Sequence, residues 1–511
     1  MIINFINKII VSDYRFKYFL FSAVSGVLLA LSFQKFNFFW LAWIAFIPLI
    51  YCILKNNFLN SVLYGFISGF IFNFIAVYWM FPFLLNNTGM IKDSLIVSLC
   101  AWFYLSLYFV IWAASVNFIK KYFQSGAIIL FVSCFWVILE FIRTYVFTGL
   151  PWNLVGYSQT SFLYIIQFAD IAGVYGLSFA VILINMLLYY LICSCSKKYF
   201  FYAVFIFLFL LSYGFWRIGA LAEEPGQKIT VAIAQPNISQ YKKWDRHYKD
   251  NIIKTLYSTS EFFKQHDIDL LVYPETVLPR RLEEDEEIQK LVNEISSNAV
   301  LTLIGGMSRE KDKIYNTVFL VSKDGVTIDK YKKHHLVIFG EYLPFRFILS
   351  KLLTTLNATG DISNGKEIKV FEFKKYTLGV SVCSENFFPY FSRKLVLKGA
   401  NILTNHTNDA WFGDMAAPYQ HFVMNIFRAV ENRKNIIVSA NTGISAVIDS
   451  SGRVVAKTKT GSKTGFVSYA YTNDYLTVYD EIGDLFVYIY FLYAAYVFIL
   501  AILSVKKKKN P

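Results

Sequence analysis

Residues 376–395 read YTLGVSVCSENFFPYFSRKL. In this stretch an apolar, β-branched strand runs into Cys383, and a helix-compatible segment follows. A cysteine at a strand-to-helix turn lies near free backbone N–H groups. Those groups and the helix dipole lower a thiol pKa and favour the reactive thiolate. Cys383 is therefore a candidate nucleophile, and a silent buried thiol is the alternative.

The residues around this stretch, about 228–480, have the composition of a soluble domain. Short apolar strands alternate there with charged amphipathic stretches, Asp245–Gln265 and Glu284–Ser297, which we expect to be helical. The expected strands are Ile229–Gln235, Asp269–Tyr273, Val300–Gly305, Thr317–Val321, Thr377–Val382, Asn401–Thr404 and Ile436–Ala440. This alternation predicts an α/β layered domain.

The rest of the chain has the composition of a membrane protein. Of the 511 residues, 56% are hydrophobic and only 16% are charged, against roughly 25% charged in soluble proteins. A membrane helix needs roughly 20 apolar residues. Eight segments approach that length: 17–33, 37–54, 59–82, 93–118, 127–147, 162–192, 199–218 and 485–504. The first could instead be a cleaved signal peptide, but its length and the spans that follow at once favour a retained anchor.

These patterns predict three parts. We expect residues 1–220 to form a transmembrane domain of about seven helices, 228–480 a folded domain that carries the candidate nucleophile, and 485–511 a last transmembrane helix with a basic tail.

Basic residues predict the orientation, because cytoplasmic loops carry an excess of Lys and Arg. If the N-terminus is cytoplasmic, only Lys35, Lys92 and Arg143 fall in the short outer loops. The cytoplasmic side receives Lys8, Arg15, Lys17, Lys55, Lys120, Lys121, Lys197, Lys198 and Lys506 to Lys509. The domain 228–480 then lies on the outer face of the cytoplasmic (inner) membrane. The net charge of +14 indicates anionic lipid headgroups, rather than nucleic acid, as the partner.

Five of the six cysteines fall in or beside apolar segments, where cysteine is usually a small buried hydrophobe. Palmitoylation of Cys193 and Cys195 is a weaker alternative. Outside the cytoplasm structural cysteines are usually paired, yet Cys383 has no partner in its domain. No ligand cluster appears, so we expect no metal and no organic cofactor.

A cysteine nucleophile needs a base and a group that stabilises the oxyanion. The histidines have no evident Asn or Asp motif partner, which leaves carboxylates and lysines. Glu275, in VYPETVLP (272–279), directly follows an apolar strand, and burial there would make it a proton acceptor. Lys333, in YKKHHLVIFGEYLP (331–344), could donate to an oxyanion. The alternative for Glu275 is an acid at the start of a helix, and the alternative for the KKHH stretch that contains Lys333 is a solvated turn.

These three segments, in this order, resemble the nitrilase superfamily, which uses a Glu–Lys–Cys triad on an α-β-β-α sandwich. Set between seven spans and one span, such a domain resembles the apolipoprotein N-acyltransferase family, over essentially the whole chain. EFIRTYVFTGLPWNLVGYSQ (140–159) is similar to the family's loop after the fifth span, and TNDAWFG (407–413) to its loop near the active site.

The resemblance implies a role for each matching residue. Glu275 would be the general base, Lys333 the oxyanion-stabilising lysine and Cys383 the nucleophile. The adjacent Lys332 is the other candidate for this role, but the spacing to the Glu of GEYLP favours Lys333. The supporting residues would be Glu341, which orients Lys333 or tunes Glu275, Glu385 beside the nucleophile, and Trp244 of QYKKWD near the lipid pocket. The family usually has Tyr where this chain has Ser384.

The family's reaction moves a fatty acyl chain from a phospholipid, through a cysteine thioester, to the α-amino group of a lipoprotein's lipidated N-terminal cysteine. One alternative is a membrane-tethered amidase that hydrolyses a small C–N substrate. Another is a transporter or scaffold. Few ionisable residues lie within the spans, because Glu140 and Asp170 are near span ends, and this argues against a path for ions or protons.

Overall fold

The computed structural model describes residues 14–221, 226–240, 242–337, 340–342, 362–374 and 376–509. Lys8 and the final Leu-Pro of GEYLP lie outside these ranges. The chain divides into two compact units, Met1–Gly214 with Asp484–Pro511, and Phe215–Gly483. We describe each unit separately.

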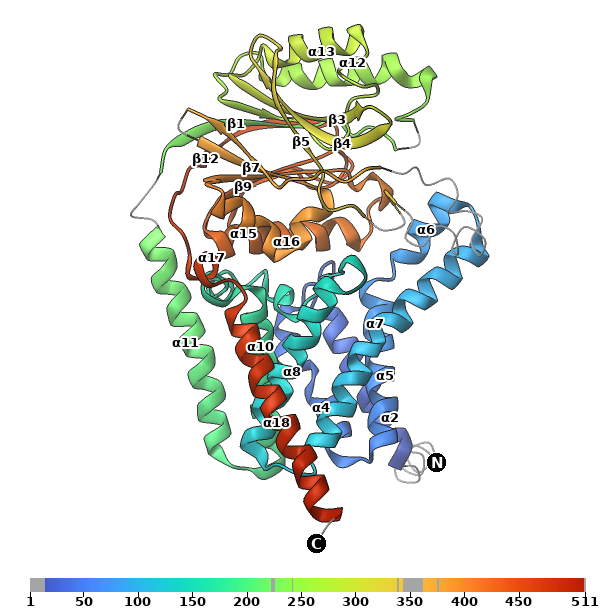
Figure 1. The fold of residues 1–511 in the computed structure, drawn as a ribbon, viewed down its shortest axis with the longest axis vertical. Coiled ribbons are helices and arrows are strands. Elements are labelled where there is room, and N and C mark those ends of the chain that lie inside the picture. The colour runs from blue at the N-terminus through green and yellow to red at the C-terminus, as the bar shows by residue number, and fades with distance from the viewer. Residues whose placement is uncertain are drawn as a thin grey trace, which may run out of the picture. The chain divides into compact units, whose positions relative to one another are not determined.

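The first unit is helical (Figure 1). Its α-helices are α2 (Tyr14–Leu31), α3 (Ala42–Ala45), α4 (Ile47–Lys55), α5 (Phe58–Ala76), α6 (Met80–Thr88), α7 (Ile91–Ile119), α8 (Ser125–Tyr145), α9 (Leu163–Ile166), α10 (Ala169–Ser194), α11 (Lys197–Leu221), whose last turns belong to the second unit, and α18 (Leu485–Lys509). A short helix of the second unit, α17 (Val478–Ile482), precedes α18. Among the described residues, six helices are long and apolar enough to cross a membrane: α5, α7, α8, α10, α11 and α18. The expectation of about eight spans is therefore met only in part, because the first two segments form shorter apolar helices.

The expected span 37–54 is broken for an identifiable reason. Pro48 lies in the first turn of α4, and proline cannot donate the backbone hydrogen bond that would continue a helix. The buried Asn185 of α10 satisfies backbone groups at the break. Its Nδ2 donates to the carbonyl of Ala42 (2.9 Å) and its Oδ1 accepts from the N–H of Phe46 (2.9 Å).

The second unit contains two six-stranded sheets. The first has the order β12-β1-β2-β3-β4-β5 and the second β11-β10-β9-β8-β7-β6. The strands of the first are β1 (Lys228–Gln235), β2 (Leu270–Val272), β3 (Leu301–Glu310), β4 (Lys313–Ser322), β5 (Thr327–Lys332) and β12 (Thr464–Tyr471). Those of the second are β6 (Val370–Phe373), β7 (Tyr376–Val382), β8 (Ile402–Thr407), β9 (Asn435–Ala440), β10 (Ala446–Ile448) and β11 (Val454–Lys457). The central strands β1, β2 and β3 are parallel, as are β7, β8 and β9.

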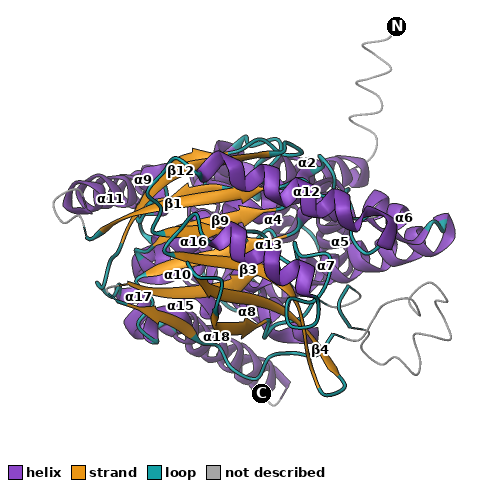
Figure 2. Cartoon of the chain, turned by 90° about the horizontal axis from the view of Figure 1, so that it is seen from above, coloured by secondary structure: helices purple, strands orange, loops and turns teal. Residues whose placement is uncertain are grey.

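Helices cover the outer face of each sheet, so this unit is an α-β-β-α sandwich (Figure 1). The helices α12 (Lys249–Ser260) and α13 (Glu286–Ser296) lie on the first sheet, and α15 (Pro389–Leu397) and α16 (Ala416–Asn432) on the second. Figure 2 shows α12 and α13 in front of the strands. Fully buried residues such as Leu256 and Leu291 join these helices to the first sheet, and burial of such side chains contributes ~1.5–3 kcal/mol each. The predicted sandwich is confirmed.

Polar contacts join the two sheets near the ends of their central strands. His406 of β8 donates from Nδ1 to the carbonyl of Tyr273, 2.7 Å away. Burial lowers the pKa of His406 to about 4, so the ring is neutral. Ser439 of β9 lies 3.2 Å from the carbonyl of Val272. Because Tyr273 is followed by Pro274 and Glu275, these contacts fix the segment that carries Glu275 against the second sheet.

Candidate active site

Glu275 lies in a tight turn just after β2. The carbonyl of Gly305 on β3 accepts from the N–H of Val277 (2.9 Å). A Cβ at Gly305 would lie 2.3 Å from the carbonyl oxygen of Pro274, so only glycine lets the turn approach β3 this closely. The side chain of Glu275 is 9% exposed.

Lys333 directly follows β5, and its backbone is held on both sides. Its N–H donates to the carbonyl of Asn316 (2.8 Å), and its carbonyl accepts from Gly365 (2.7 Å). The ammonium lies 2.9 Å from Oε2 of Glu341 and 3.6 Å from Oε1 of Glu275. Burial works against its charge, but Glu341 and Glu275 outweigh burial and raise the pKa of Lys333. Lys333 is therefore a permanently charged, buried cation.

Lys332 points elsewhere. Its ammonium lies 2.5 Å from Oε1 of Glu310 and 4.4 Å from the centre of the Tyr315 ring. Of the two adjacent lysines, only Lys333 contacts Glu275 and Glu341.

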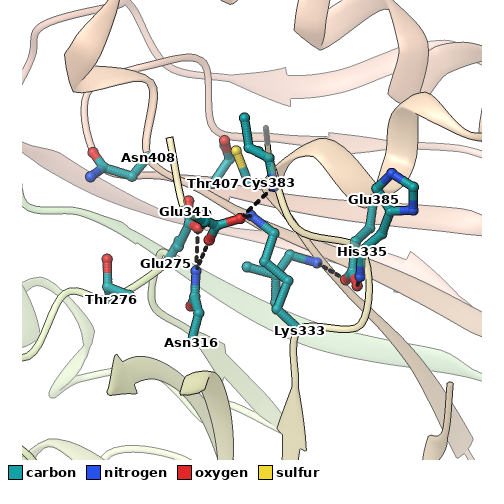
Figure 3. A network of polar contacts seen from close by, with 12 residues as sticks. Glu275, Thr276, Asn316, Lys333, His335, Glu341, Cys383, Glu385, Thr407 and Asn408 are labelled. Carbon is teal, nitrogen blue, oxygen red and sulfur yellow. Dashed lines mark hydrogen bonds and ion pairs between the residues drawn. The ribbon is translucent and has the colours of Figure 1, made fainter. Parts of the chain in front are cut away.

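The amide of Asn316 bridges the two carboxylates. Its Nδ2 donates to Oε1 of Glu275 (2.7 Å) and to Oε1 of Glu341 (3.0 Å). Both contacts to Glu275, from Asn316 and from Lys333, thus use the same carboxylate oxygen. Among the described residues, the other oxygen of Glu275 has no hydrogen-bond partner, which leaves it available for a proton. Figure 3 shows these side chains pointing toward one another, with Cys383 beside them.

Cys383 is the first residue after β7 and begins a short 3-10 helix, η7 (Cys383–Phe387). Its φ is +51°, a left-handed conformation that costs a non-glycine residue ~1–3 kcal/mol. Asn405 of β8 donates from Nδ2 to the carbonyl of Cys383 (3.2 Å) and helps to hold this turn. The half-buried thiol is thereby presented at the end of the strand.

The electrostatic surroundings of the thiol differ from our expectation. Burial raises the pKa of Cys383 well above its ordinary value, and the carboxylates of Glu275 and Asp409 add to this effect. Lys333 and the hydroxyl of Thr407 act in the opposite direction but do not prevail. The expected lowering of the thiol pKa was wrong, because dehydration and two nearby negative charges outweigh any local backbone dipoles. Cys383 is therefore a protonated thiol near neutral pH, and a base would have to remove its proton before it could act as a nucleophile.

Glu385 ties the Lys333 segment to the Cys383 turn. One carboxylate oxygen accepts from the N–H groups of His334 (2.7 Å) and His335 (3.0 Å), and the other from the N–H of Val382 (2.7 Å). The hydroxyl of Tyr331 adds a fourth donor at 2.8 Å. Burial raises the pKa of Glu385 to about 7. Glu385 thus holds the backbone next to Lys333 and the backbone next to Cys383 in place.

The two remaining sequence candidates lie at the edge of this network. Trp244 is 48% exposed, and the ammonium of the preceding residue, Lys243, lies 5.6 Å from the centre of its ring. Ser384 is buried, and its hydroxyl has no partner among the described residues.

Sequence reasoning missed a buried pair near Cys383, formed by His421 and Asp409. His421 of α16 lies with Nδ1 2.9 Å from Oδ1 of Asp409 and with Nε2 3.1 Å from Oδ1 of Asn386. No sequence motif marks these partners of His421, which the fold supplies. The pair is separated by twelve residues and forms because α16 folds back beside the loop. Thr407 and Asp409 belong to the TNDAWFG segment, and its run of three polar residues, Thr407 to Asp409, all of them buried, was the available signal.

This arrangement suits nucleophilic acyl chemistry. It combines a thiol, a carboxylate with a free oxygen, and a charged lysine that is held by other carboxylates. Such a set can remove the thiol proton and stabilise a tetrahedral oxyanion.

Comparisons with known proteins identify the class. Residues 230–475 match the carbon-nitrogen hydrolase family, and residues 25–187 match the apolipoprotein N-acyltransferase N-terminal domain. Saccharomyces cerevisiae Nit3, described as a member of branch 10 of the nitrilase superfamily, is a similar solved structure. The match has 21% identity and a TM-score of 0.37, and covers 49% of this chain and 91% of Nit3.

Full-length relatives narrow the class to one family. The apolipoprotein N-acyltransferase of Geobacter metallireducens is 35% identical over 487 residues, which are 92% of each chain. That of Rickettsia typhi is 32% identical over 84% of this chain and 88% of its own. The chain belongs to the apolipoprotein N-acyltransferase family, and it is an acyltransferase. This confirms the resemblance seen in the sequence.

Proposed function

We propose that this protein transfers a fatty acyl group from a phospholipid, through a thioester on Cys383, to the α-amino group of the lipidated N-terminal cysteine of lipoproteins. The observation that carries the proposal is the convergence of Glu275, Lys333 and Cys383 at one site in a chain of this family.

In the first half-reaction, Glu275 accepts the thiol proton and the sulfur of Cys383 attacks the ester carbonyl of the phospholipid. The raised thiol pKa makes this proton transfer necessary. The tetrahedral intermediate collapses with cleavage of the ester C–O bond. The leaving lysophospholipid alcohol takes the proton back from Glu275, and the acyl thioester remains.

In the second half-reaction, the α-amino group of the lipoprotein attacks the thioester carbonyl. Glu275 accepts a proton from the amine as the C–N bond forms. The C–S bond then breaks, and the proton returns to the sulfur of Cys383. The products are the N-acylated lipoprotein and the free thiol, so the enzyme is ready for another phospholipid.

Lys333 stabilises the oxyanion in both intermediates. Its charge is maintained by Glu341, 2.9 Å away, and it is buried, so its interaction with a developing negative charge is little screened by water. Glu341 acts as the supporting carboxylate that orients Lys333. Glu385 positions the two backbone segments that meet at the site.

Trp244 binds lipid in this proposal. An exposed indole beside the catalytic turn offers a large apolar surface to an acyl chain, and its N–H can face water or a headgroup.

The proposal assigns residues 228–480 to the catalytic domain and assigns 1–220 and 485–511 to the membrane. It places the catalytic domain on the outer face of the inner membrane, as the distribution of basic residues favours. Reporter fusions at the C-terminal tail and within the exposed Ser322–Gly325 turn test this orientation. A cytoplasmic signal from the turn would contradict it.

The function is tested with the purified full chain, a phospholipid and a diacylglyceryl lipopeptide. The wild-type protein is expected to form the N-acylated lipopeptide, and Cys383→Ala is expected to abolish transfer. Cys193→Ala, at an exposed cysteine of α10, is the matched control and should retain wild-type activity. N-acylation by Cys383→Ala would refute the role of the thiol.

A further inference from the structure

A second lysine is buried beside the general base. Lys243 is 1% exposed. Its ammonium donates to the hydroxyl of Thr276 (2.6 Å) and lies 3.4 Å from the carbonyl oxygen of Glu275. Burying an ammonium is costly unless polar partners compensate it. Both of these partners belong to the turn that carries the general base.

That turn is conformationally strained. Thr276 has a φ of +42°, which is an outlier for a β-branched residue. Gly305 of β3 holds the next residue from one side, through its hydrogen bond from Val277. Lys243 holds Glu275 and Thr276 through the contacts described above. The direction of the Glu275 carboxylate therefore depends on a turn that is clamped between β3 and a buried ammonium.

Lys243 also belongs to the segment that presents Trp244. The two neighbours have opposite exposure, since Lys243 is buried and the Trp244 side chain is 48% exposed. A backbone hydrogen bond from the N–H of Asp245 to the carbonyl of Lys242 (3.2 Å) closes a tight turn that contains both Lys243 and Trp244. The exposed indole of Trp244 and the buried contact of Lys243 with Thr276 thus belong to adjacent residues of one short segment.

We propose that Lys243 is a positioning residue that clamps the Glu275–Thr276 turn and couples it to the segment bearing Trp244. Occupation of the Trp244 surface by a lipid substrate would then align the Glu275 carboxylate. This inference rests on the proposed acyl-transfer function. It adds to that function a link between a surface contact with lipid and the base inside the site.

The electrostatic role of the clamp is separate from that of Lys333. Burial lowers the pKa of Lys243 to about 8, and Glu275 only partly offsets the effect. Glu275 is the one charged group that acts on Lys243 among the described residues. The charge of Lys243 is thus held less firmly than that of Lys333, whose pKa is raised by two carboxylates.

The test uses the full chain, four single variants and the double variant of Lys243→Met with Thr276→Val. Lys243→Met removes the donors while keeping the length of the side chain, and Lys243→Arg keeps both donors and charge. Thr276→Val removes the acceptor on the turn. Lys242→Met, at the exposed neighbour, is the matched control. Each variant is measured for kcat, for KM of the phospholipid and for thermal midpoint.

We expect Lys243→Met to lower kcat about 10- to 100-fold, as misplaced catalytic groups do, with little change in the thermal midpoint. Lys243→Arg should recover most of the loss, and Lys242→Met should match the wild type. The effects of Lys243→Met and Thr276→Val on kcat should not add in the double variant, because both substitutions remove the same hydrogen bond between Lys243 and Thr276.

Wild-type kcat in Lys243→Met would overturn the inference. If Lys243→Met fails to fold, Thr276→Val serves as the test instead. A kcat of Thr276→Val equal to that of the wild type would then overturn the inference. A lack of transfer by the wild-type chain is a different result, since it would overturn the proposed function and with it this inference.

Discussion

The ammonium of Lys333 lies 2.9 Å from Oε2 of Glu341, and neither group can move without disturbing the other. Oε2 of Glu341 also accepts from the N–H of Val337 (2.8 Å), so the carboxylate itself is held by backbone. The lysine is therefore preorganised before any substrate arrives. Electrostatic stabilisation is most effective when the charge needs no rearrangement during the reaction.

Replacing Lys333 should therefore be far more harmful than replacing its neighbour. Lys333→Ala is expected to reduce acyl transfer by ~100- to 1,000-fold, as loss of an oxyanion donor does. Lys332→Ala removes a surface ion pair to Glu310 and should change the rate less than about twofold. The measurement is the rate of lipopeptide N-acylation. The reverse order of effects would mean that Lys332 carries the function.

Asn316 should matter because its amide orients two carboxylates at once. Asn316→Leu has a similar volume but leaves the inner oxygens of Glu275 and Glu341 without their amide donor. We expect kcat to fall about 10- to 100-fold through misalignment of the base, with KM for the phospholipid nearly unchanged. Asn251→Ala, on the exposed face of α12, is the control. A change in KM alone would show that Asn316 acts in binding.

The reactivity of the thiol should respond to its charged neighbours with opposite signs. The thiol pKa is raised by burial, Glu275 and Asp409 and is lowered by Lys333. Asp409→Asn should therefore lower the thiol pKa and speed alkylation of Cys383 by iodoacetamide, and Lys333→Met should slow it. In the wild type, alkylation should increase steadily as the pH rises, since the thiolate forms only near the raised pKa. Slower alkylation of Asp409→Asn would contradict this assignment.

Glu385 should contribute to stability through its four donors. Glu385→Gln places an N–H₂ group where the carboxylate accepted backbone N–H groups, and should cost ~1–3 kcal/mol of unfolding free energy. The raised pKa, about 7, also fixes the sign of a pH effect. The folded state holds this proton more tightly than the unfolded chain, so the contribution of Glu385 to stability falls as pH rises toward 7.

Thermal unfolding of the full chain in detergent, measured as the pH is raised from acidic values to about 7, checks both effects of Glu385. The Gln variant should have a lower thermal midpoint and should lack the carboxyl's pH dependence. An equal midpoint for the two proteins would mean that the four donors find other partners.

Strand patterns in the sequence predicted seven of the eight strands that do not lie at a sheet edge, because these seven are apolar and largely buried. The strands β5, β6, β10, β11 and β12 escaped prediction. Polar, partly exposed residues fill β5, as in TIDKYK, and β10 has only three residues. Apolar runs located the membrane helices, but run length could not reveal that Asn185 stabilises a break between Ala42 and Phe46.

The sequence predicted only those candidate site residues that lie in recognisable local motifs. Glu275, Lys333 and Cys383 each stand at the end of a strand, and motif spacing distinguished Lys333 from Lys332. Contacts made by folding over long sequence distances had no local signal. The bridge from Asn316 to Glu275, the clamp by Lys243 and the raised thiol pKa all depend on burial and on partners far apart in sequence.

Mass spectrometry of the Cys383 peptide tests the central claim most directly. The purified full chain is incubated with a phospholipid of defined acyl chain, digested, and analysed before and after addition of an amine-bearing diacylglyceryl lipopeptide. We predict that the Cys383 peptide gains the mass of that acyl chain, that hydroxylamine removes it, and that the lipopeptide discharges it as its own N-acylated form appears. Formation of the N-acylated lipopeptide by a protein whose Cys383 never carries the acyl group would contradict the account.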